Sequence, residues 1–175
     1  MNRKLTDYEL FMIVLGIFAF GRWMRERSAM EILFLCGFYL LLFAAGRMDQ
    51  REGRIPDRYL WLALLLGLLS LPFFPEIPLF ARIVGGLSVS VPLFGCCLIR
   101  RGAFGGGDIK LMAGCGFFLG TETVLCGFAW AVFAGAAFGI GGLLTGRAGR
   151  KDRFPFGPFL CAGMALALAQ RFPRM

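Results

Sequence analysis

The chain has 175 residues, of which 58% are hydrophobic and 17% charged, and its formal net charge is +8. A soluble domain typically has about 45–50% apolar and about 25% charged residues, so this composition excludes an ordinary soluble domain and predicts a protein embedded in a lipid bilayer. The chain has no histidine, which excludes Ser-His and Cys-His nucleophiles and the HExxH zinc site.

Long apolar blocks alternate with short polar joints along the chain. A helix that spans the hydrocarbon core needs about 20 mostly apolar residues. The blocks are Leu10–Trp23, Met30–Ala45, Tyr59–Leu71, Leu79–Ile99, Ile109–Leu119, Val124–Leu144 and Phe159–Ala169. We expect the first and fifth to be the least regular, as partial or tilted segments. A cleaved signal peptide is the alternative for the first block, but its far end lacks a small-residue cleavage site.

These blocks predict an all-α fold, a polytopic transmembrane bundle of six or seven helices. We expect one membrane-embedded domain over residues 1–175, with an N-terminal helix and loop at 1–28 and the core at 29–175. If the N-terminus lies inside the cell and there are seven spans, 13 of the 19 lysines and arginines fall on the inner side, as the positive-inside rule requires. The net charge therefore reflects topology, and nucleic-acid binding is not expected.

The joint after the second block carries a first candidate site. Asp49 lies about one turn past Ala45, so a continued helix would hold its carboxylate near the inner membrane boundary. Pro56 disfavours helix at the residue before it and predicts a new helix from about Asp57. Asp57 is interpreted as a capping or first-turn acid.

The joint after the fourth block carries the second candidate site. Gly105, Gly106 and Gly107 allow a sharp bend and a close approach to another helix, and they deliver Asp108 to the start of the next helix. A capping role is the plain alternative for Asp108, and phosphate binding is not expected because the Walker pattern is absent.

Two carboxyl groups held close together offer hydrolysis without histidine. They cannot both ionise readily, so one keeps a proton while the other activates a water molecule between them. Asp108 opens a helix, where the dipole favours the ionised form, and Asp49 follows a helix end, where the dipole favours the proton. We therefore predict that Asp108 is the base and Asp49 the initial acid.

The remaining polar chemistry is limited. The six cysteines lie in or at the ends of apolar blocks and form no CxxC pair, so we interpret them as packing residues and expect neither a metal site nor a cofactor. The glycines of the fifth and sixth blocks, including Gly135-x-x-x-Gly139 and Gly142-x-x-x-Gly146, predict close helix contacts.

Taken together, three segments resemble the type IV prepilin peptidase family. They are Asp49 followed by Pro56-Asp57, the GxGD-type run Gly105 to Leu111, and the run Phe154 to Leu160. The resemblance implies a membrane-embedded aspartyl endopeptidase that removes the short basic leader from prepilins or pseudopilins at the cytoplasmic face of the inner membrane. It implies Asp49 and Asp108 as the catalytic pair.

The resemblance also implies residues that line or support the site. These are Pro56, Gly105, Gly106, Gly107, Lys110, Phe156, Gly157 and Pro158. Lys110 is equally open to a second interpretation, a lysine that anchors the inner boundary. Larger family members carry two CxxC pairs linked to zinc and N-methylation, and this sequence has neither, so we expect a short, peptidase-only form.

Other interpretations remain open. Presenilin-type proteases pair GxGD with a tyrosine-aspartate and a Pro-Ala-Leu element, and this sequence shows neither. A small ion-coupled transporter would hold its acids near the middle of the membrane, whereas these acids fall at joints. A structural membrane subunit of a secretion or pilus assembly would need neither aspartate.

Overall fold

The computed structural model describes residues 7–26, 28–99, 105–144 and 156–171. Over these ranges the chain is helical and has no strand, which confirms the all-α prediction. The seven helices are α1 (Asp7–Glu26), α2 (Ala29–Glu52), α3 (Asp57–Leu69), α4 (Leu79–Ile99), α5 (Gly106–Leu119), α6 (Thr121–Leu144) and α7 (Gly157–Arg171).

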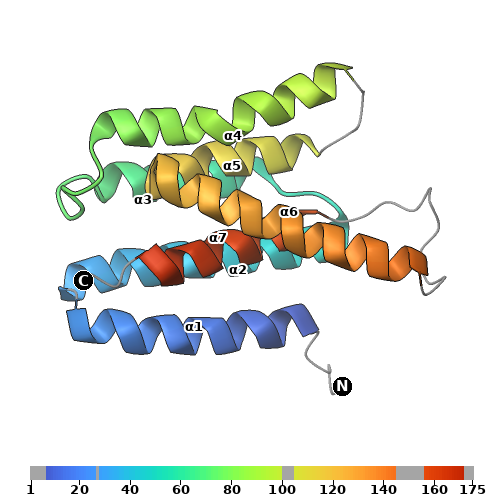
Figure 1. Cartoon of the computed structure of the whole chain (residues 1–175). Helices are drawn as coiled ribbons and strands as arrows, with labels where there is room; N and C mark the ends of the chain where they lie inside the picture. The colour runs from blue at the N-terminus through green and yellow to red at the C-terminus, as the bar shows by residue number, and fades with distance from the viewer. Residues whose placement is uncertain (1–6, 27, 100–104, 145–155, 172–175) are drawn as a thin grey trace.

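The helices lie side by side along one axis, and the chain reverses direction from each helix to the next (Figure 1). As a result α1 begins and α7 ends at opposite ends of the bundle. The start of α1 lies at the same end as the starts of α3, α5 and α7, and we call this the motif end. Both aspartate-bearing joints lie at the motif end, because two helices of opposite direction, α3 and α4, separate them in the chain.

Helix lengths differ in a way that bears on the membrane. Among the described residues, α2, α4 and α6 are long and apolar enough to cross a membrane, and α7 is a shorter apolar helix. The 13-residue α3 and the 14-residue α5 reach only about 20 Å at 1.5 Å per residue, less than the hydrocarbon core. The fifth block is thus a partial segment, as expected, whereas the first block lies in a continuous helix of 20 residues.

Glycines join the helices in pairs, and each pair includes a glycine of the fifth or sixth block, as predicted. Gly146, of the predicted pair Gly142-x-x-x-Gly146, lies outside the described residues. A β-carbon on Gly85 of α4 would lie 2.6 Å from the carbonyl oxygen of Gly116 in α5, and Gly127 of α6 contacts Gly163 of α7 in the same way. At Gly139, within the predicted motif, an added β-carbon would meet no atom within 4 Å. Small residues therefore set the helix spacing at these two interfaces, and Gly139 does not contribute.

Arg82, at the end of the bundle opposite the motif end, is fully buried rather than exposed to an outer solvent layer. Its guanidinium donates to the Ser70 hydroxyl oxygen at 3.0 Å and to backbone carbonyls at 3.3–3.5 Å. The carbonyls belong to Gly67, Phe74, Ile77, Phe117 and Phe118. Arg82 thereby donates to carbonyls near the ends of both short helices, α3 and α5.

Candidate active site

Asp49 occupies the last turn of α2. The helix runs past its apolar block to Glu52, as predicted, and ends at Gly53, whose φ of 62° is the left-handed conformation common at helix ends. The Gly53 N–H donates to the Asp49 carbonyl oxygen at 2.8 Å. The side chain of Asp49 is 8% exposed, so the final turn of a membrane-length helix holds a carboxyl group inside the bundle.

Asp108 lies in the first turn of α5. The preceding Gly105 is the N-cap residue of the helix, and its carbonyl oxygen accepts the Asp108 N–H at 3.0 Å. The Gly105 N–H in turn donates to the Asp108 carboxylate. Asp108 is 7% exposed, and it precedes the apolar block of α5. The predicted placement at a helix start is confirmed.

The two carboxyl groups lie close enough to interact electrostatically. The pKa of Asp108 is raised to about 6, chiefly by burial and also by the charge of Asp49, while the hydrogen bond from Gly105 acts in the opposite direction. Two acids distant in sequence thus share one buried environment. The helix start was expected to favour ionised Asp108, and burial outweighs that effect. Which member keeps the proton stays a prediction.

The start of α7 completes the surroundings of Asp49. The Gly157 N–H donates to the Asp49 carboxylate, and a β-carbon on Gly157 would lie 2.5 Å from Asp49 Oδ2. The contact therefore needs a residue without a side chain. Phe156 caps α7, because its carbonyl oxygen accepts from the N–H groups of the third and fourth residues after it, both at 3.1 Å. Phe154 and Pro155 of the same motif lie outside the described residues.

Gly107 brings the two aspartate joints into contact. A β-carbon there would lie 2.8 Å from the Ile55 carbonyl oxygen, so the α2–α3 joint packs directly on the first turn of α5. Pro56, the N-cap residue of α3, has an extended ψ of 146° and ends this joint as predicted. At Gly106, by contrast, an added β-carbon would meet no atom within 4 Å, so crowding does not explain why a glycine occupies this position.

Lys110 pairs with Asp57. Its Nζ lies 2.8 Å from both carboxylate oxygens of Asp57, and the two side chains are 50% and 60% exposed. Asp57 is the first residue of α3 and an acid of its first turn, as predicted, while Pro56 occupies the N-cap position. The pair therefore links the starts of α3 and α5 at the edge of the site, where exposed ion pairs contribute at most about 1 kcal/mol.

Cys161 is a neighbour of the site that the sequence interpretation assigned only to packing. It is fully buried and close enough to interact electrostatically with both Asp49 and Asp108. The sequence alone could have placed Cys161 near the site, because it lies four residues after Gly157 and therefore on the same face of α7. Within the described residues no three histidine, cysteine or acidic side chains gather as metal ligands would.

Comparison with known proteins relates this arrangement to a family. Residues 36–140, which contain both aspartates, match the model of the type IV leader peptidase family. The chain is 32% identical over 150 residues to a prepilin leader peptidase/N-methyltransferase of Bacillus subtilis. These 150 residues cover 82% of the chain and 58% of that protein. It is 31% identical over 167 residues to one of Burkholderia pseudomallei, covering 92% of the chain and 54% of that protein.

A shorter relative matches over most of its length. The leader peptidase HopD of Salmonella typhimurium is 32% identical over 149 residues, which is 81% of the chain and 94% of HopD. No solved structure matches the chain. The chain thus spans little more than half the length of the first two relatives and nearly all of the third. On the family match, the similarity and the apolar helices, this membrane protein belongs to the type IV leader peptidase family.

Proposed function

We propose that the protein is a membrane-embedded aspartyl endopeptidase that cleaves the short basic leader from type IV prepilins or pseudopilins. One observation carries the proposal: Asp49 and Asp108 come from different joints, are both at least 90% shielded from solvent, and interact with each other at the motif end. Family membership supports the reaction class, and the names of the similar proteins support the choice of substrate.

The proposed chemistry needs one proton shared by two carboxyl groups. The ionised member would take a proton from a water molecule as it attacks the scissile carbonyl, and the protonated member would donate a hydrogen bond to the developing oxyanion. With its pKa raised to about 6, Asp108 is poised to exchange a proton near neutral pH. The helix dipoles favour Asp108 as the base and Asp49 as the initial acid, whereas a pKa of Asp108 raised by burial and by the charge of Asp49 favours the reverse order. The assignment therefore stays a prediction.

The neighbouring residues are proposed to position this pair. Gly157, through its N–H, orients the Asp49 carboxylate, and Gly105 does the same for Asp108. Gly107 lets the two joints touch, and Pro56 starts the short helix beside them. Phe156 and Pro158 frame the first turn of α7, and Lys110 holds α5 to α3 from the edge.

We further propose that residues 29–175 form the protease core, that the protein lies in the inner membrane, and that the motif end faces the cytoplasm. The basic joints support this orientation through the positive-inside rule. The leader of the substrate is charged and its following segment is apolar, so the scissile bond would lie at the same boundary as the aspartates. The proposal covers cleavage alone and not methylation.

The test is co-expression with candidate prepilins in a peptidase-deficient host. Wild-type protein should shorten the prepilin, and Asp49→Asn and Asp108→Asn should each leave it uncut. Glu52→Gln is the matched control, because Glu52 lies in the same last turn of α2 but is exposed, and it should process normally. Processing that survives both aspartate substitutions would reject the aspartate pair as the catalytic groups. A wild-type protein that leaves every prepilin uncut would favour a transporter or a structural subunit instead.

A further inference from the structure

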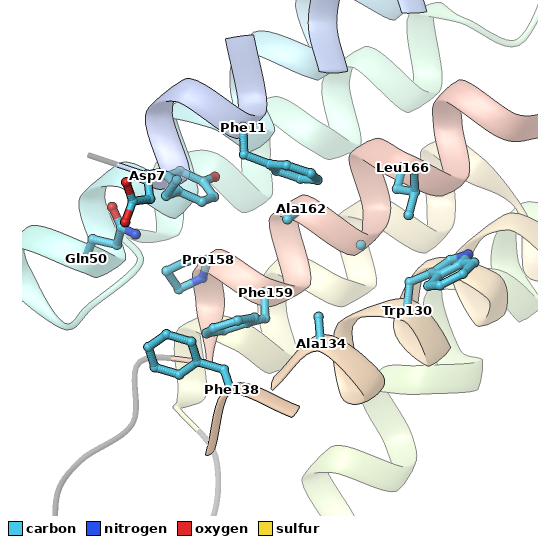
Figure 2. A pocket seen from close by; sticks show the side chains of 12 residues that line it. Asp7, Phe11, Gln50, Trp130, Ala134, Phe138, Pro158, Phe159, Ala162 and Leu166 are labelled. Atoms are coloured by element: carbon cyan, nitrogen blue, oxygen red, sulfur yellow. The ribbon is translucent and has the colours of Figure 1, made fainter. Parts of the chain in front are cut away.

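An apolar groove runs from the site along α7, between α7, α1 and α6. Its volume is about 500 Å³, and Figure 2 shows the side chains that line it. On α7 these side chains recur at helical spacing, from Pro158 through Phe159, Ala162 and Gly163 to Leu166, so the groove follows the helix for about 12 Å at 1.5 Å per residue.

One end of this groove is at the candidate active site. Gln50 follows Asp49, and Pro158 follows the glycine whose N–H contacts Asp49. In Figure 2, Gln50, Pro158 and Asp7 gather at one end, whereas Trp130 and Leu166 lie toward the other. Neither aspartate lines the groove itself, so a chain that lies in it would approach the aspartates only at this end.

The chemistry of the lining is uneven along this direction. Phe11, Phe138 and Phe159 supply large apolar surfaces, while Ala134 and Ala162 leave room between them. The charged residue of the lining is Asp7, and it is exposed and lies at the aspartate end. The groove thus offers apolar contact along its length and a negative charge beside the site.

We propose that this groove binds the apolar helical segment that follows the scissile bond of the substrate, with the basic leader directed past Asp7. The inference rests on the proposed function and adds to it where the substrate lies. A helix with apolar residues at i, i+3, i+4 and i+7 fits such a groove, and small residues at its floor allow close packing of helices within a membrane. The charge at the aspartate end is complementary to a basic leader.

The proposal also gives α1 a part in binding. Asp7, Tyr8 and Phe11 form one wall of the groove, and the Tyr8 hydroxyl packs against Gly46 of α2, one turn before Asp49. We predicted residues 1–28 as a segment separate from the core, so an interaction of α1 with the substrate goes beyond that division.

The test uses two alanines of α6 that differ in position alone. Ala134 lines the groove, whereas Ala136, two residues on, lies on another face of the same helix and does not line this groove; both are exposed. Ala134→Trp should raise the KM for a full-length prepilin at least about tenfold with kcat within about twofold, because it fills the groove and leaves the aspartates in place. Ala136→Trp should match the wild type in both constants.

A second measurement identifies the occupant. A photo-activated benzoylphenylalanine at position 134 or 136, in the uncleaving Asp108→Asn protein, is irradiated in membranes that contain the prepilin. Cross-links from position 134 to the apolar segment of the prepilin, absent from position 136, support the proposal. Cross-links from position 134 only to phospholipid or to a second copy of the chain overturn it, as does an unchanged KM in Ala134→Trp when the wild type cleaves. If the wild type cleaves no prepilin, the proposed function itself fails.

Discussion

Replacing Asp108 by asparagine should stabilise the protein at neutral pH, and the gain should disappear in acid. Burial first, and then the charge of Asp49, raises the pKa of Asp108 from its ordinary value of 3.8 to about 6. A carboxyl group with a higher pKa in the folded than in the unfolded state favours folding while it is protonated. That contribution is complete below a pH of about 4 and is lost as the pH rises through about 6.

The size of the effect follows from the same shift. A difference of about two pKa units corresponds to about 3 kcal/mol at 1.36 kcal/mol per unit. The wild type loses this much stability when Asp108 ionises at high pH, whereas the asparagine variant does not. For a chain of this length about 3 kcal/mol is about 6–12 °C in Tm. The gain would accompany loss of activity, as expected where a site holds a destabilising group for its chemistry.

Thermal unfolding in detergent at pH 4 and pH 8 measures this prediction. Asp108→Asn should melt well above the wild type at pH 8 and within about 2 °C of it at pH 4. Glu52→Gln, which neutralises an exposed acid, should leave Tm nearly unchanged at both pH values. An Asp108→Asn protein that is less stable at pH 8, or equally stabilised at both, would refute the reasoning that burial penalises the ionised carboxylate.

Three substitutions test other features by their effect on structure and activity. Gly157→Ala should abolish processing in a folded protein, because its β-carbon would displace the aspartate of α2, whereas Gly139→Ala, in open space, should be silent in a prepilin-cleavage assay. Gly107→Ala should reduce cleavage at least about a hundredfold by separating the two joints, and Gly106→Ala should retain most of it. Arg82→Met should lower the free energy of unfolding by about 3–5 kcal/mol, measured by thermal unfolding, because buried carbonyls lose their donor.

The sequence predicted the helices and the location of the acids because both depend on local information. Apolar blocks and Pro56 define where helices run and begin, and α3 starts at Asp57 as expected. Alternation of helix direction then puts the joints that carry Asp49 and Asp108 at one end (Figure 1). Their contact could be predicted only as a hypothesis, since it depends on packing between helices.

The sequence revealed only one side of each close contact between helices. Gly116 and Gly127 belong to the fifth and sixth blocks, whose glycines were predicted to allow close contact, and both do so. Their partners Gly85 and Gly163 could not be predicted, because such pairs have no fixed separation in sequence. The orientation with seven spans puts Arg82 among the six basic residues of the outer side. Its burial depends on five carbonyl groups and a hydroxyl that only the folded chain gathers.

Among the predicted supporting residues, the structure distinguishes contact from proximity. Gly157 and Gly105 donate to the two carboxylates, which their place in a motif could not show in advance. Lys110 had two interpretations, and its ion pair with Asp57 favours a role at the edge of the site. For Gly106 the structure offers no steric reason.

The central claim is that Asp49 and Asp108 act as one catalytic unit, and initial rates of prepilin cleavage by purified protein test it most directly. Residues that act together are not additive, so Asp49→Asn, Asp108→Asn and the double variant should all fall to the same residual rate. The account is contradicted if either single variant keeps a substantial rate, or if the double variant is slower than both by the product of the single effects.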